Sequence, residues 1–535
     1  MPIPEKIVLL SGAVSSGKSV LAGMLVQRFG FQRLKTKEVI KKKFPKAGNN
    51  RRSLQECGER LDRKTGGSWV RDEIQLLIDE KEPERLLVDA VRIKKQVDAI
   101  RKAYGPHVQH IHLEASPDLL RERYKLKRME GFEELPSYDD VAHDPVEKQV
   151  NQLKKIADVV IQILHSNEED VLVRAASHLG LYGAEHERLV DVLVGGQYGS
   201  EGKGHVASYL AREYDILVRV GGPNAGHTVF HDPEPYTHHH LPSGTRFSRA
   251  RLLIAPGAVL SVPSLLQEIA DCDVSTERLS IDPQAMVIDK EDIAREKKLV
   301  ESIGSTGQGV GAATARRILG RSETPRLARD IPELKPYTTK PVREVLEQAY
   351  LERRRILLEG TQGVGLSLYH GSYPYVTSRD TTVAGCLAEA GIAPTRVRKV
   401  LMVCRTYPIR VQDPQDGSSG PMSEEISWKV IADRSGIPLE ELEHLELTST
   451  TRRKRRVGEF DWALLRKAAS LNGPTDIALT FADYISAKNT RARRFEQLTQ
   501  ETIRFAEEIE KVSGAPVSLI STRFHWRSII DRRSW

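Results

Sequence analysis

The sequence predicts an α/β protein built from two P-loop-like domains, each with a mainly parallel β-sheet flanked by helices. Short apolar runs alternate with longer charged segments along the whole chain. Apolar strands that are separated by helices are typical of parallel sheets buried on both faces. In addition, two of these runs lead directly into a glycine-rich loop that carries a lysine, which is a common phosphate-binding arrangement.

Seven runs have the length and apolar character of buried strands. In chain order they are IVLLSG (7–12), LLVDA (86–90), VQHIHLEA (108–115), DVLVGG (191–196), DILVRVGG (215–222), RILLEG (355–360) and DIALTF (476–481). Helix-like segments such as SVLAGMLVQRF and RRSLQECGERLDR lie between them. This alternation predicts that the strands are joined by helical crossovers.

The chain is expected to form two domains. Its 535 residues are too many for one typical hydrophobic core. The pattern breaks near residues 165–190, where the polar segment HSNEED and a helix-like stretch precede a second strand–helix series that restarts at Val192. We therefore expect a smaller domain at 1–170 and a larger one at 188–535.

The composition excludes some classes of protein. No apolar run reaches the roughly 18 residues of a membrane-spanning helix, and the apolar start of the chain leads into a glycine turn, so a strand and not a cleavable signal is expected there. The four cysteines show neither metal-ligand spacing nor a paired framework, which favours a cytoplasmic location. The net charge of +7 suits either nucleic acid or a small substrate with several phosphates and carboxylates, and the small substrate is favoured.

The first glycine loop reads GAVSSGKS and runs from Gly12 to Ser19. It matches the G-x-x-x-x-G-K-[ST] pattern between a predicted strand and a predicted helix. In that setting the amides of the loop from Gly12 to Gly17 hold phosphate oxygens, Lys18 neutralises the transferred phosphate, and the Ser19 hydroxyl can ligate Mg²⁺. The loop predicts that a nucleoside triphosphate binds there.

Other segments of this domain narrow the prediction. Asp89 ends a predicted strand, where its carboxylate can support the Mg²⁺ shell, and Arg92 follows just beyond. The arginines of LEASPDLLRERYKLKR (113–128) resemble the lid of the nucleoside monophosphate kinase and dephospho-coenzyme A kinase group, and RRSLQECGERLDR (51–63) resembles its acceptor-binding helix. A domain that binds ATP without transferring phosphate is the alternative.

The second glycine loop, GGQYGSEGKGH (195–205), is not a Walker A loop, because its lysine is followed by glycine. It opens a series of long motifs. These are VRVGGPNAGHTV (218–229), HHLPSG (239–244), STGQGVG (305–311), LLEGTQGVGLSLYHGSYPYVTS (357–378), TSTTRRKRRVG (448–458) and GAPVSLISTRF (514–524). In this order, the series resembles the adenylosuccinate synthetase family across residues 190–535.

The resemblance implies a ligase reaction. Enzymes of this family use a nucleoside triphosphate and Mg²⁺ to join L-aspartate to position 6 of a purine nucleoside monophosphate. The γ-phosphate is first moved to the purine 6-oxygen, and the aspartate amine then displaces it. A homodimer is also implied, whereas a nucleic-acid partner or a membrane is not.

Site residues follow from the resemblance position by position. The triphosphate is assigned to Lys203 and the loop residues Gly199, Glu201, Gly202 and Gly204. The Gly226 carbonyl is assigned to Mg²⁺, and His227 protonates or stabilises the charge that develops between the 6-oxygen and the γ-phosphate.

The two remaining substrates are assigned in the same way. The acceptor nucleotide and its 5′-phosphate are assigned to Asn224, Thr306, Gln362 and Thr377. The aspartate carboxylates are assigned to Thr451, Arg453 and Arg455, because the guanidinium fork suits a carboxylate. The arginine that a neighbouring subunit lends to the acceptor phosphate falls in ATARRILGR, where Arg321 is the first choice and Arg317 the second.

One departure from the family concerns Ser200, which occupies a position that is both catalytic and metal-binding in the family. The usual aspartate there removes the N1 proton of a 6-oxopurine, and a serine hydroxyl is too weak a base to replace it. Shortening the side chain also opens space beside N1 and C2 of the base, where a 2-amino group fits. This substitution resembles the phage branch that makes 2-aminoadenylosuccinate from dGMP, so (d)GMP is the favoured acceptor, with IMP as the alternative.

The donor site departs as well. Family members recognise guanine through a Lys-x-Asp turn, whereas this chain has Phe481 and Asp483 there, followed later by the segment STRF (521–524). GTP, ATP and dATP therefore remain open as donors. A nucleotide-binding regulator without turnover is the alternative from another class, and a nucleic-acid-binding protein would instead show steeply salt-dependent binding.

Overall fold

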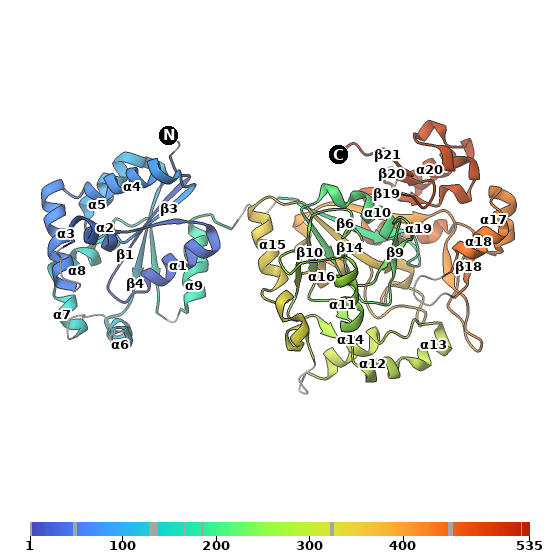
Figure 1. Cartoon of the computed structure of the whole chain (residues 1–535), viewed down its shortest axis with the longest axis horizontal. Coiled ribbons are helices and arrows are strands. Elements are labelled where there is room, and N and C mark those ends of the chain that lie inside the picture. Colours follow the sequence, from blue (N-terminus) through green and yellow to red (C-terminus); the bar gives the residue numbers. More distant parts are fainter. Residues whose placement is uncertain are drawn as a thin grey trace. The chain divides into compact units, whose positions relative to one another are not determined.

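The computed structural model describes residues 3–45, 51–127, 137–164, 166–182, 187–321, 326–447, 453–525 and 527–535. The chain forms two compact units, Met1–Gly183 and Ala184–Trp535, each with its own sheet and helices (Figure 1). Both sheets are mainly parallel and covered by helices, which confirms the predicted fold class. No helix among the described residues is long and apolar enough to cross a membrane.

The first unit contains a five-stranded parallel sheet. Its strands, in spatial order, are β2 (Gln32–Lys35), β3 (Arg85–Asp89), β1 (Lys6–Gly12), β4 (Val108–Glu114) and β5 (Val159–Gln162). Its helices are α1 (Lys18–Phe29), α2 (Thr36–Lys43), α3 (Arg51–Thr65), α4 (Trp69–Lys81), α5 (Lys94–Tyr104), α6 (Pro117–Lys127), α7 (Tyr138–Ala142), α8 (Pro145–Gln152) and α9 (Glu168–His178). Helices α1 and α9 lie on one side of this sheet and α4 and α5 on the other (Figure 1).

The helix α9 belongs to the first unit. It begins with a capping box at Asn167 and buries Val171, Leu172, Ala175 and Ala176. These apolar side chains give the helix a face that packs onto the unit beside α1. The unit therefore extends beyond residue 170, where the sequence pattern placed the end of the first domain.

The second unit contains a nine-stranded sheet that is parallel except at one edge. Its strands, in spatial order, are β12 (Leu279–Ile281), β10 (Arg251–Ile254), β7 (Ile216–Arg219), β14 (Ile356–Gly363), β6 (Val190–Gly195), β15 (Val397–Arg405), β19 (Asp476–Thr480), β20 (Val517–Ser521) and the antiparallel β21 (Ile529–Asp531). Its helices are α10 (Lys203–Leu210), α11 (Val262–Asp271), α12 (Lys290–Arg295), α13 (Lys297–Ile303), α14 (Val310–Leu319), α15 (Val342–Leu351), α16 (Val383–Ala390), α17 (Trp428–Ser435), α18 (Leu439–Leu445), α19 (Trp462–Asn472) and α20 (Gln500–Ser513).

Three small sheets complete the second unit. They are the antiparallel β16 (Ile409–Val411), β18 (Arg455–Gly458) and β17 (Glu425–Ile426), the antiparallel pair β8 (His227–Val229) and β9 (Tyr236–His238), and the parallel pair β11 (Val259–Leu260) and β13 (Met286–Val287). The first of these sheets carries Arg455, and the second begins at His227. Both predicted site residues are thus held by strand pairing.

The core of the second unit lies on both faces of the large sheet. In β6, the alternating Val190, Val192 and Val194 pack with residues of α15, α16, α19 and α20. Leu193, which points the other way, packs with residues of α10 and α11. All seven predicted strand runs hold a strand, because a strand buried on both faces requires the continuous apolar pattern from which it was predicted.

Candidate functional site

Each unit places its glycine loop at the same topological position. In the first unit, β1 lies between β3 and β4, and in the second, β6 lies between β14 and β15. From each of these central strands the chain runs first to one side of the sheet and later to the other. In open α/β sheets, ligands bind outside the carboxyl ends of the strands at this switch point. Both loops are therefore where a ligand site is expected.

In the first unit a cavity of about 870 Å³ lies at the glycine loop. Its lining includes five residues that the sequence analysis assigned a role: Gly17, Lys18, Ser19, Asp89 and Arg92. Glycine is required at Gly12, because a Cβ there would come within 2.5 Å of the carbonyl oxygen of Leu113. Gly17 has a φ of 85° directly before α1, a conformation that favours glycine.

The cations and carboxylates of this cavity are engaged with one another. Lys18 Nζ donates to the carbonyl oxygens of Gly12 and Ala13 at 2.7 Å each. The Asp89 carboxylate is bonded by the guanidinium of Arg33. At the loop end of the cavity, Lys18 is thus held by backbone carbonyls, and Asp89 is paired with Arg33.

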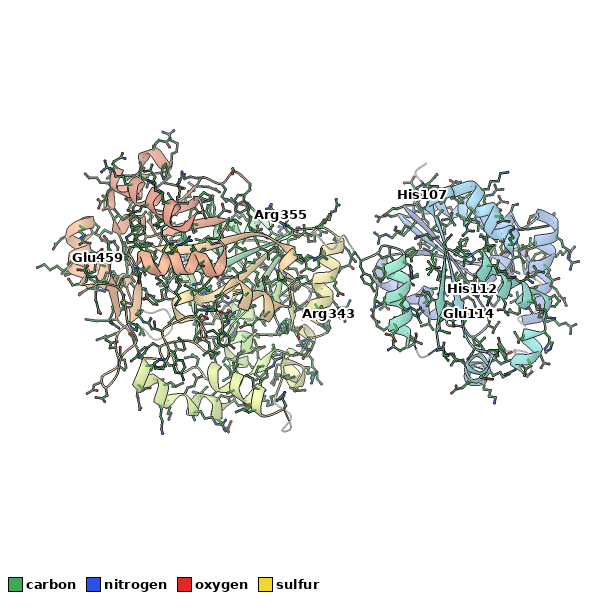
Figure 2. All side chains as sticks on the ribbon, turned by 180° about the vertical axis from the view of Figure 1, so that it is seen from behind. His107, His112, Glu114, Arg343, Arg355 and Glu459 are labelled. Atoms are coloured by element: carbon green, nitrogen blue, oxygen red, sulfur yellow. The ribbon has the colours of Figure 1, made fainter. Side chains whose placement is uncertain are left out.

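A buried polar group lies on the strands beneath this loop. Ser11 Oγ contacts His110 Nε2 at 2.7 Å and His112 Nδ1 at 2.8 Å, and Figure 2 labels His112 on β4. Burial lowers the pKa of each histidine to about 4, so both rings are neutral at pH 7. These hydrogen bonds join the three side chains in the core, and none of the three lines the cavity.

In the second unit the glycine loop is folded tightly against β14. Gly199 has a φ of 114°, and a Cβ there would lie 3.2 Å from Gln362 Cα. At Gly195 a Cβ would lie 2.6 Å from the Gln362 carbonyl oxygen. Gly202, with a φ of 85°, precedes α10, and a Cβ at Gly204 would lie 2.9 Å from His227 Cβ. The glycines therefore allow the loop to approach both Gln362 and His227.

Lys203 and Glu201 form a buried ion pair inside the loop. Lys203 Nζ lies 2.6 Å from Glu201 Oε2 and donates to the Gly199 carbonyl oxygen at 2.9 Å. The other carboxylate oxygen of Glu201 accepts from the amides of Gln197 and Gly199 at 3.0 and 2.7 Å. The Glu201 carboxylate is thus engaged in shaping the loop, whereas Ser200 Oγ makes no hydrogen bond to any residue that the structure describes.

His227 is part of a buried polar cluster at the carboxyl ends of β7 and β14. Its Nδ1 lies 2.5 Å from Glu359 Oε1, and Arg219 Nη1 donates to the same oxygen at 3.1 Å. The backbone amide of Ser243 donates to Glu359 Oε2 at 2.8 Å. The Nε2 atom of His227 is buried and has no hydrogen-bond partner among the described residues, so it is the atom available to a ligand.

The charges of this cluster follow from its burial. Burial would raise the pKa of Glu359, but Arg219 and the hydrogen bonds from His227 and Ser243 hold it below its usual range. Burial and the nearby Arg219 lower the pKa of His227, although Glu359 opposes this shift. At neutral pH the anionic Glu359 therefore fixes the proton of a neutral His227 on Nδ1.

Two of the four residues assigned to the acceptor nucleotide, Asn224 and Thr377, are in direct contact. Asn224 Nδ2 donates to Thr377 Oγ1 at 3.3 Å, and Asn224 Oδ1 is buried without a described partner. The Gln362 side chain points its Nε2 into the interior, also without a partner. Thr306 precedes α14, whose Val310 packs against Gly222 in the turn that carries Asn224.

The residues assigned to aspartate are described in part. Arg455 Nη1 donates to Glu446 Oε2 at 2.8 Å, and its Nε is buried without a partner among the described residues. Arg453 is half-buried just before β18. Thr451 lies outside the described residues.

The turn that the sequence assigned to the donor base lies near the glycine loop, with Phe481 close to Gly202. Phe481 has a φ of 59° and precedes the short helix η9 (Ala482–Tyr484). Asp483 Oδ1 is buried with no partner among the described residues, and burial raises the pKa of Asp483 to about 7. The Phe524 ring lies 5.4 Å from the ring of His205 on α10. Both departures from the family pattern therefore lie close to the segment formed by the glycine loop and α10.

The two arginines considered for a neighbouring subunit differ in their contacts. Arg317 Nη1 donates to the Pro256 carbonyl oxygen at 2.9 Å. Arg321 is exposed beyond the end of α14. Neither belongs to the clusters described above.

The predicted metal ligands are neutral oxygens. Ser200 supplies a hydroxyl and Gly226 a carbonyl, and no group of three His, Cys, Asp or Glu side chains suited to a metal occurs in the described ranges. Mg²⁺ prefers oxygen ligands and is commonly held by substrate phosphates with few protein ligands. These residues therefore fit a Mg²⁺ ion that arrives with the triphosphate, and not a resident metal centre.

Four residues of the second site were missed by the sequence analysis: Arg219, Glu359, Arg405 and Glu446. Arg219 and Glu359 carry a detectable signal, because each is a charged residue at the end of an apolar strand, and the two are paired in register. Arg405 ends β15 in the same way. Glu446 follows a surface helix, where a carboxylate is ordinary, so no sequence signal marked it.

Comparisons with known proteins bear on the second unit. The family model of adenylosuccinate synthetase matches residues 192–328 and 321–490. Curated adenylosuccinate synthetases of Pyrococcus sp. (strain ST700) and Methanocaldococcus jannaschii are 39% and 38% identical to the chain over 352 and 355 residues. These alignments cover 64% of this chain and 98% and 96% of the relatives.

Two solved structures share this fold. Fully ligated adenylosuccinate synthetase from Plasmodium falciparum has a TM-score of 0.55 at 22% identity and covers 64% of this chain and all of its own. The succinoaminodeoxyadenylate synthetase of cyanophage S-2L, bound to dGMP and to dATP as an energy donor, has a TM-score of 0.53 at 28% identity and covers 65% of this chain and 96% of its own. With its loops, its strand-end clusters and the match of the family model, the chain belongs to the adenylosuccinate synthetase family, ligases that form a carbon–nitrogen bond.

Proposed function

We propose that the second unit joins L-aspartate to guanosine or deoxyguanosine monophosphate and forms the 2-amino form of (deoxy)adenylosuccinate. The observation that carries this proposal is the state of the glycine loop. Ser200 places a small neutral side chain where the family pattern has an aspartate, and the adjacent Glu201 carboxylate is held inside the loop by Lys203 and two amides. The loop therefore offers space and a hydroxyl to a 2-amino group, and no carboxylate stands in the way.

The roles proposed for the chain's residues come from the family resemblance, and their placement supports them. The loop amides and Lys203 bind the triphosphate, and the bound Mg²⁺ supplies charge neutralisation to its phosphates. The γ-phosphoryl group moves from the triphosphate to the guanine 6-oxygen, the guanine base releases its N1 proton to solvent water, and the nucleoside diphosphate leaves. The aspartate amine then attacks C6, releases a proton to solvent water, and displaces inorganic phosphate.

His227 is placed to serve both steps. Its unpartnered Nε2 takes up a proton as negative charge gathers around it, and the anionic Glu359 stabilises the resulting imidazolium at Nδ1. The protonated ring then donates to the oxygen between the base and the phosphoryl group. Arg453 and Arg455 bind the aspartate carboxylates, and Asn224 with Thr377 binds the acceptor nucleotide.

The comparison with a guanine-using relative supports this choice of acceptor. The cyanophage enzyme was solved with dGMP and dATP, and it resembles the second unit over nearly its whole length. The archaeal relatives are more similar in sequence and are adenylosuccinate synthetases. IMP is therefore the competing acceptor.

The test is an assay of the full chain with Mg²⁺, L-aspartate and each of ATP, dATP and GTP. IMP, GMP and dGMP are offered separately, and aspartyl adducts are detected by mass spectrometry. Adducts are expected from GMP or dGMP. The Ser200→Asp variant is expected to shift the acceptor preference towards IMP by at least about tenfold, since a buried clash or an unmatched polar group typically costs that much or more. An adduct from IMP alone would reject the guanine assignment.

We infer a second function, phosphoryl transfer, for the first unit. The supporting observation is the cavity of about 870 Å³, which extends from the glycine loop to α3 and α5 and has room for a donor and an acceptor. Lys18 and Ser19 line it at the loop, and Arg33 and Arg92 line it further along. A nucleoside monophosphate is the acceptor class that two such basic positions fit.

This second function is tested with the ligase silenced. In a His227→Ala background, common nucleoside monophosphates are incubated with ATP and Mg²⁺, and diphosphates are separated by anion-exchange chromatography. If nucleoside diphosphate forms in the His227→Ala protein and no longer forms in the His227→Ala, Lys18→Ala double variant, the result supports phosphoryl transfer by the first unit. Tight ATP binding without product would instead favour a unit that only binds nucleotide.

A further inference from the structure

Arg405 is a buried arginine at the end of β15 that holds the glycine loop of the second unit. Only 1% of its surface is exposed. Its backbone amide and carbonyl exchange hydrogen bonds with the Gln197 side-chain amide, both at 3.0 Å. Its Nη1 donates to the Ser200 carbonyl oxygen at 3.3 Å. The position of the phosphate-binding loop therefore depends on this side chain.

The same guanidinium contacts the donor-base turn. Its Cζ lies 4.0 Å from the centre of the Phe481 ring, within the range of a cation–π contact. Thr406, the next residue, donates from Oγ1 to the Phe481 carbonyl oxygen at 2.8 Å. Movement of the turn that carries Asp483 is thereby linked to Arg405.

Glu446 connects Arg405 to the arginine assigned to aspartate. Its Oε1 accepts from Arg405 Nη2 at 2.8 Å and from Tyr484 Oη at 2.7 Å. Its Oε2 accepts from Arg455 Nη1 at 2.8 Å. Although burial opposes ionisation, Arg405 and then Arg455 hold the pKa of Glu446 well below its usual range. One carboxylate is thus shared by two guanidinium groups, and one positive charge remains for an anionic ligand.

We propose that the Arg405–Glu446 pair is a positioning unit that couples binding of the triphosphate donor to binding of L-aspartate. The proposal rests on the site assignments of the proposed function. The pair touches neither reacting atom in those assignments, and it acts through Ser200, Phe481 and Arg455. It deepens the ligase assignment by stating how the two substrates influence each other.

The physical reason for the coupling is shared ordering. A donor base held at Phe481 and Asp483 restrains the turn, and the turn restrains Arg405 and Tyr484, which fix Glu446. Arg455 then meets the aspartate carboxylate with less conformational freedom left to lose, so aspartate binds more tightly. Linkage requires that aspartate tighten donor binding by the same factor.

The experiment measures equilibrium binding to the full chain. The dissociation constant of L-aspartate is determined by calorimetry with and without the non-hydrolysable imido analogue of ATP or GTP, in the presence of dGMP and, in parallel, IMP. In the native protein the analogue is expected to tighten aspartate binding by roughly 5- to 150-fold, the usual range of coupling between sites. In Glu446→Gln this factor is expected to fall to about one, because a neutral amide no longer balances both guanidinium groups.

Two further variants separate coupling from folding. Arg405→Lys keeps the charge but loses the planar fork and the flat contact with Phe481, so it is expected to lose the coupling as well. Asp191→Asn is the matched control. Asp191 is likewise a buried carboxylate bonded by an arginine and a tyrosine, Arg398 and Tyr214, but it lies at the opposite end of β6. It is expected to lose stability and to keep the coupling.

The outcomes decide the proposal. Equal weakening of aspartate binding with and without the donor analogue in Glu446→Gln would overturn it, because Glu446 would then only orient Arg455. Equal aspartate affinity in both conditions in the native protein would overturn it too. Coupling that is present with IMP and absent with dGMP would support the role of the Arg405–Glu446 pair. That result would reject only the assignment of a guanine nucleotide as the acceptor.

Discussion

At the scale of single residues, the central feature of the second site is a histidine whose protonation is governed by one carboxylate. Glu359 accepts from His227, Arg219 and Ser243, all of which are buried. Its negative charge lets His227 become an imidazolium in an interior that otherwise strongly disfavours one. Glu359 is therefore expected to act through His227 and not on the substrate itself.

The first prediction follows for Glu359→Gln. Removing the charge withdraws the support for a protonated His227, so kcat is expected to fall by about 10²- to 10⁴-fold, the usual worth of acid–base catalysis. Steady-state kinetics test this, with the KM values for the three substrates expected to change far less. Asp191→Asn serves as the control for stability, since it also leaves a paired arginine without its carboxylate. If both variants lose kcat equally, the loss reflects folding and the role of Glu359 is rejected.

The second prediction concerns Asp483. Burial, with a contribution from Glu446, raises its pKa from 3.8 to about 7, so the carboxyl group is mostly neutral at pH 6 and mostly ionised at pH 8. The guanine edge presents two adjacent N–H donors and needs an ionised carboxylate, whereas the adenine edge presents one donor and one acceptor, which a neutral carboxyl group matches. The KM for GTP is therefore expected to rise as the pH falls from 8 to 6, by up to about tenfold for a single group of this pKa.

The KM for ATP should change in the opposite direction, falling as the pH falls from 8 to 6, and initial rates at fixed acceptor and aspartate concentrations measure both KM values. The effect of pH on the stability contribution of Asp483 is opposite in sign to that of an aspartate whose pKa is lowered by folding. Because the folded pKa is raised, the contribution of Asp483 is favourable below about pH 4 and is lost as the pH rises through 7. Asp483→Asn should accordingly raise the melting temperature more at pH 8 than at pH 5. A GTP-to-ATP preference that is independent of pH would contradict this account.

At the scale of elements, the site depends on strand ends and on the glycines that let loops approach them. The β6 loop meets β14 closely enough that a Cβ at Gly199 would contact the Gln362 backbone. The adjoining small sheet brings Arg455 to the same region as the donor-base turn through Glu446. Side chains that are far apart in sequence therefore meet because parallel strands end at one edge of the sheet.

The third prediction is that Gly199→Ala disrupts the donor site. Its φ of 114° and its 3.2 Å approach to Gln362 combine backbone strain with a steric conflict. The KM for the triphosphate is expected to rise and kcat to fall, as measured by initial rates. Gly391→Ala is the matched control, because Gly391 also has a positive φ, 68°, but a Cβ there meets nothing within 4 Å. Gly391→Ala should lower the free energy of unfolding by about 1 kcal/mol and leave KM and kcat unchanged. Equal changes of KM and kcat in the two variants would count against a specific role for the loop at Gly199.

At the scale of the whole molecule, two units each combine a central strand with a phosphate-binding type of loop. Each unit has its own hydrophobic core among the described residues. The family match lies in the second unit. The first unit, with its large cavity, is thus an addition to the part of the chain that matches the family.

The fourth prediction is that the two activities are separable by single substitutions. Lys18→Ala should lower phosphoryl transfer to nucleoside monophosphates by about 100-fold or more, as expected when a cation at a transferring phosphoryl group is lost. It should leave the formation of aspartyl adducts unchanged. His227→Ala should do the reverse, and both reactions are followed in one chromatographic assay of the full chain. A loss of both activities in either variant would contradict independent sites.

The sequence by itself determined the fold class, the central strands and the two glycine loops, since buried parallel strands and phosphate-binding turns have local patterns. The motif series likewise placed His227, Lys203, Asn224 and Thr377, and the structure brings Asn224 and Thr377 into contact. Only the tertiary structure decided which carboxylate bonds to which basic side chain. It pairs Glu201 with Lys203 inside the loop and Glu359 with His227 across strands.

The tertiary structure also joins Arg405 to Arg455 through Glu446. Arg405 and Glu446 are 41 positions apart in the sequence, and His227 and Glu359 are 132 positions apart. No local pattern encodes them, because their energy arises only when folding removes both groups from water and leaves each the other as its partner.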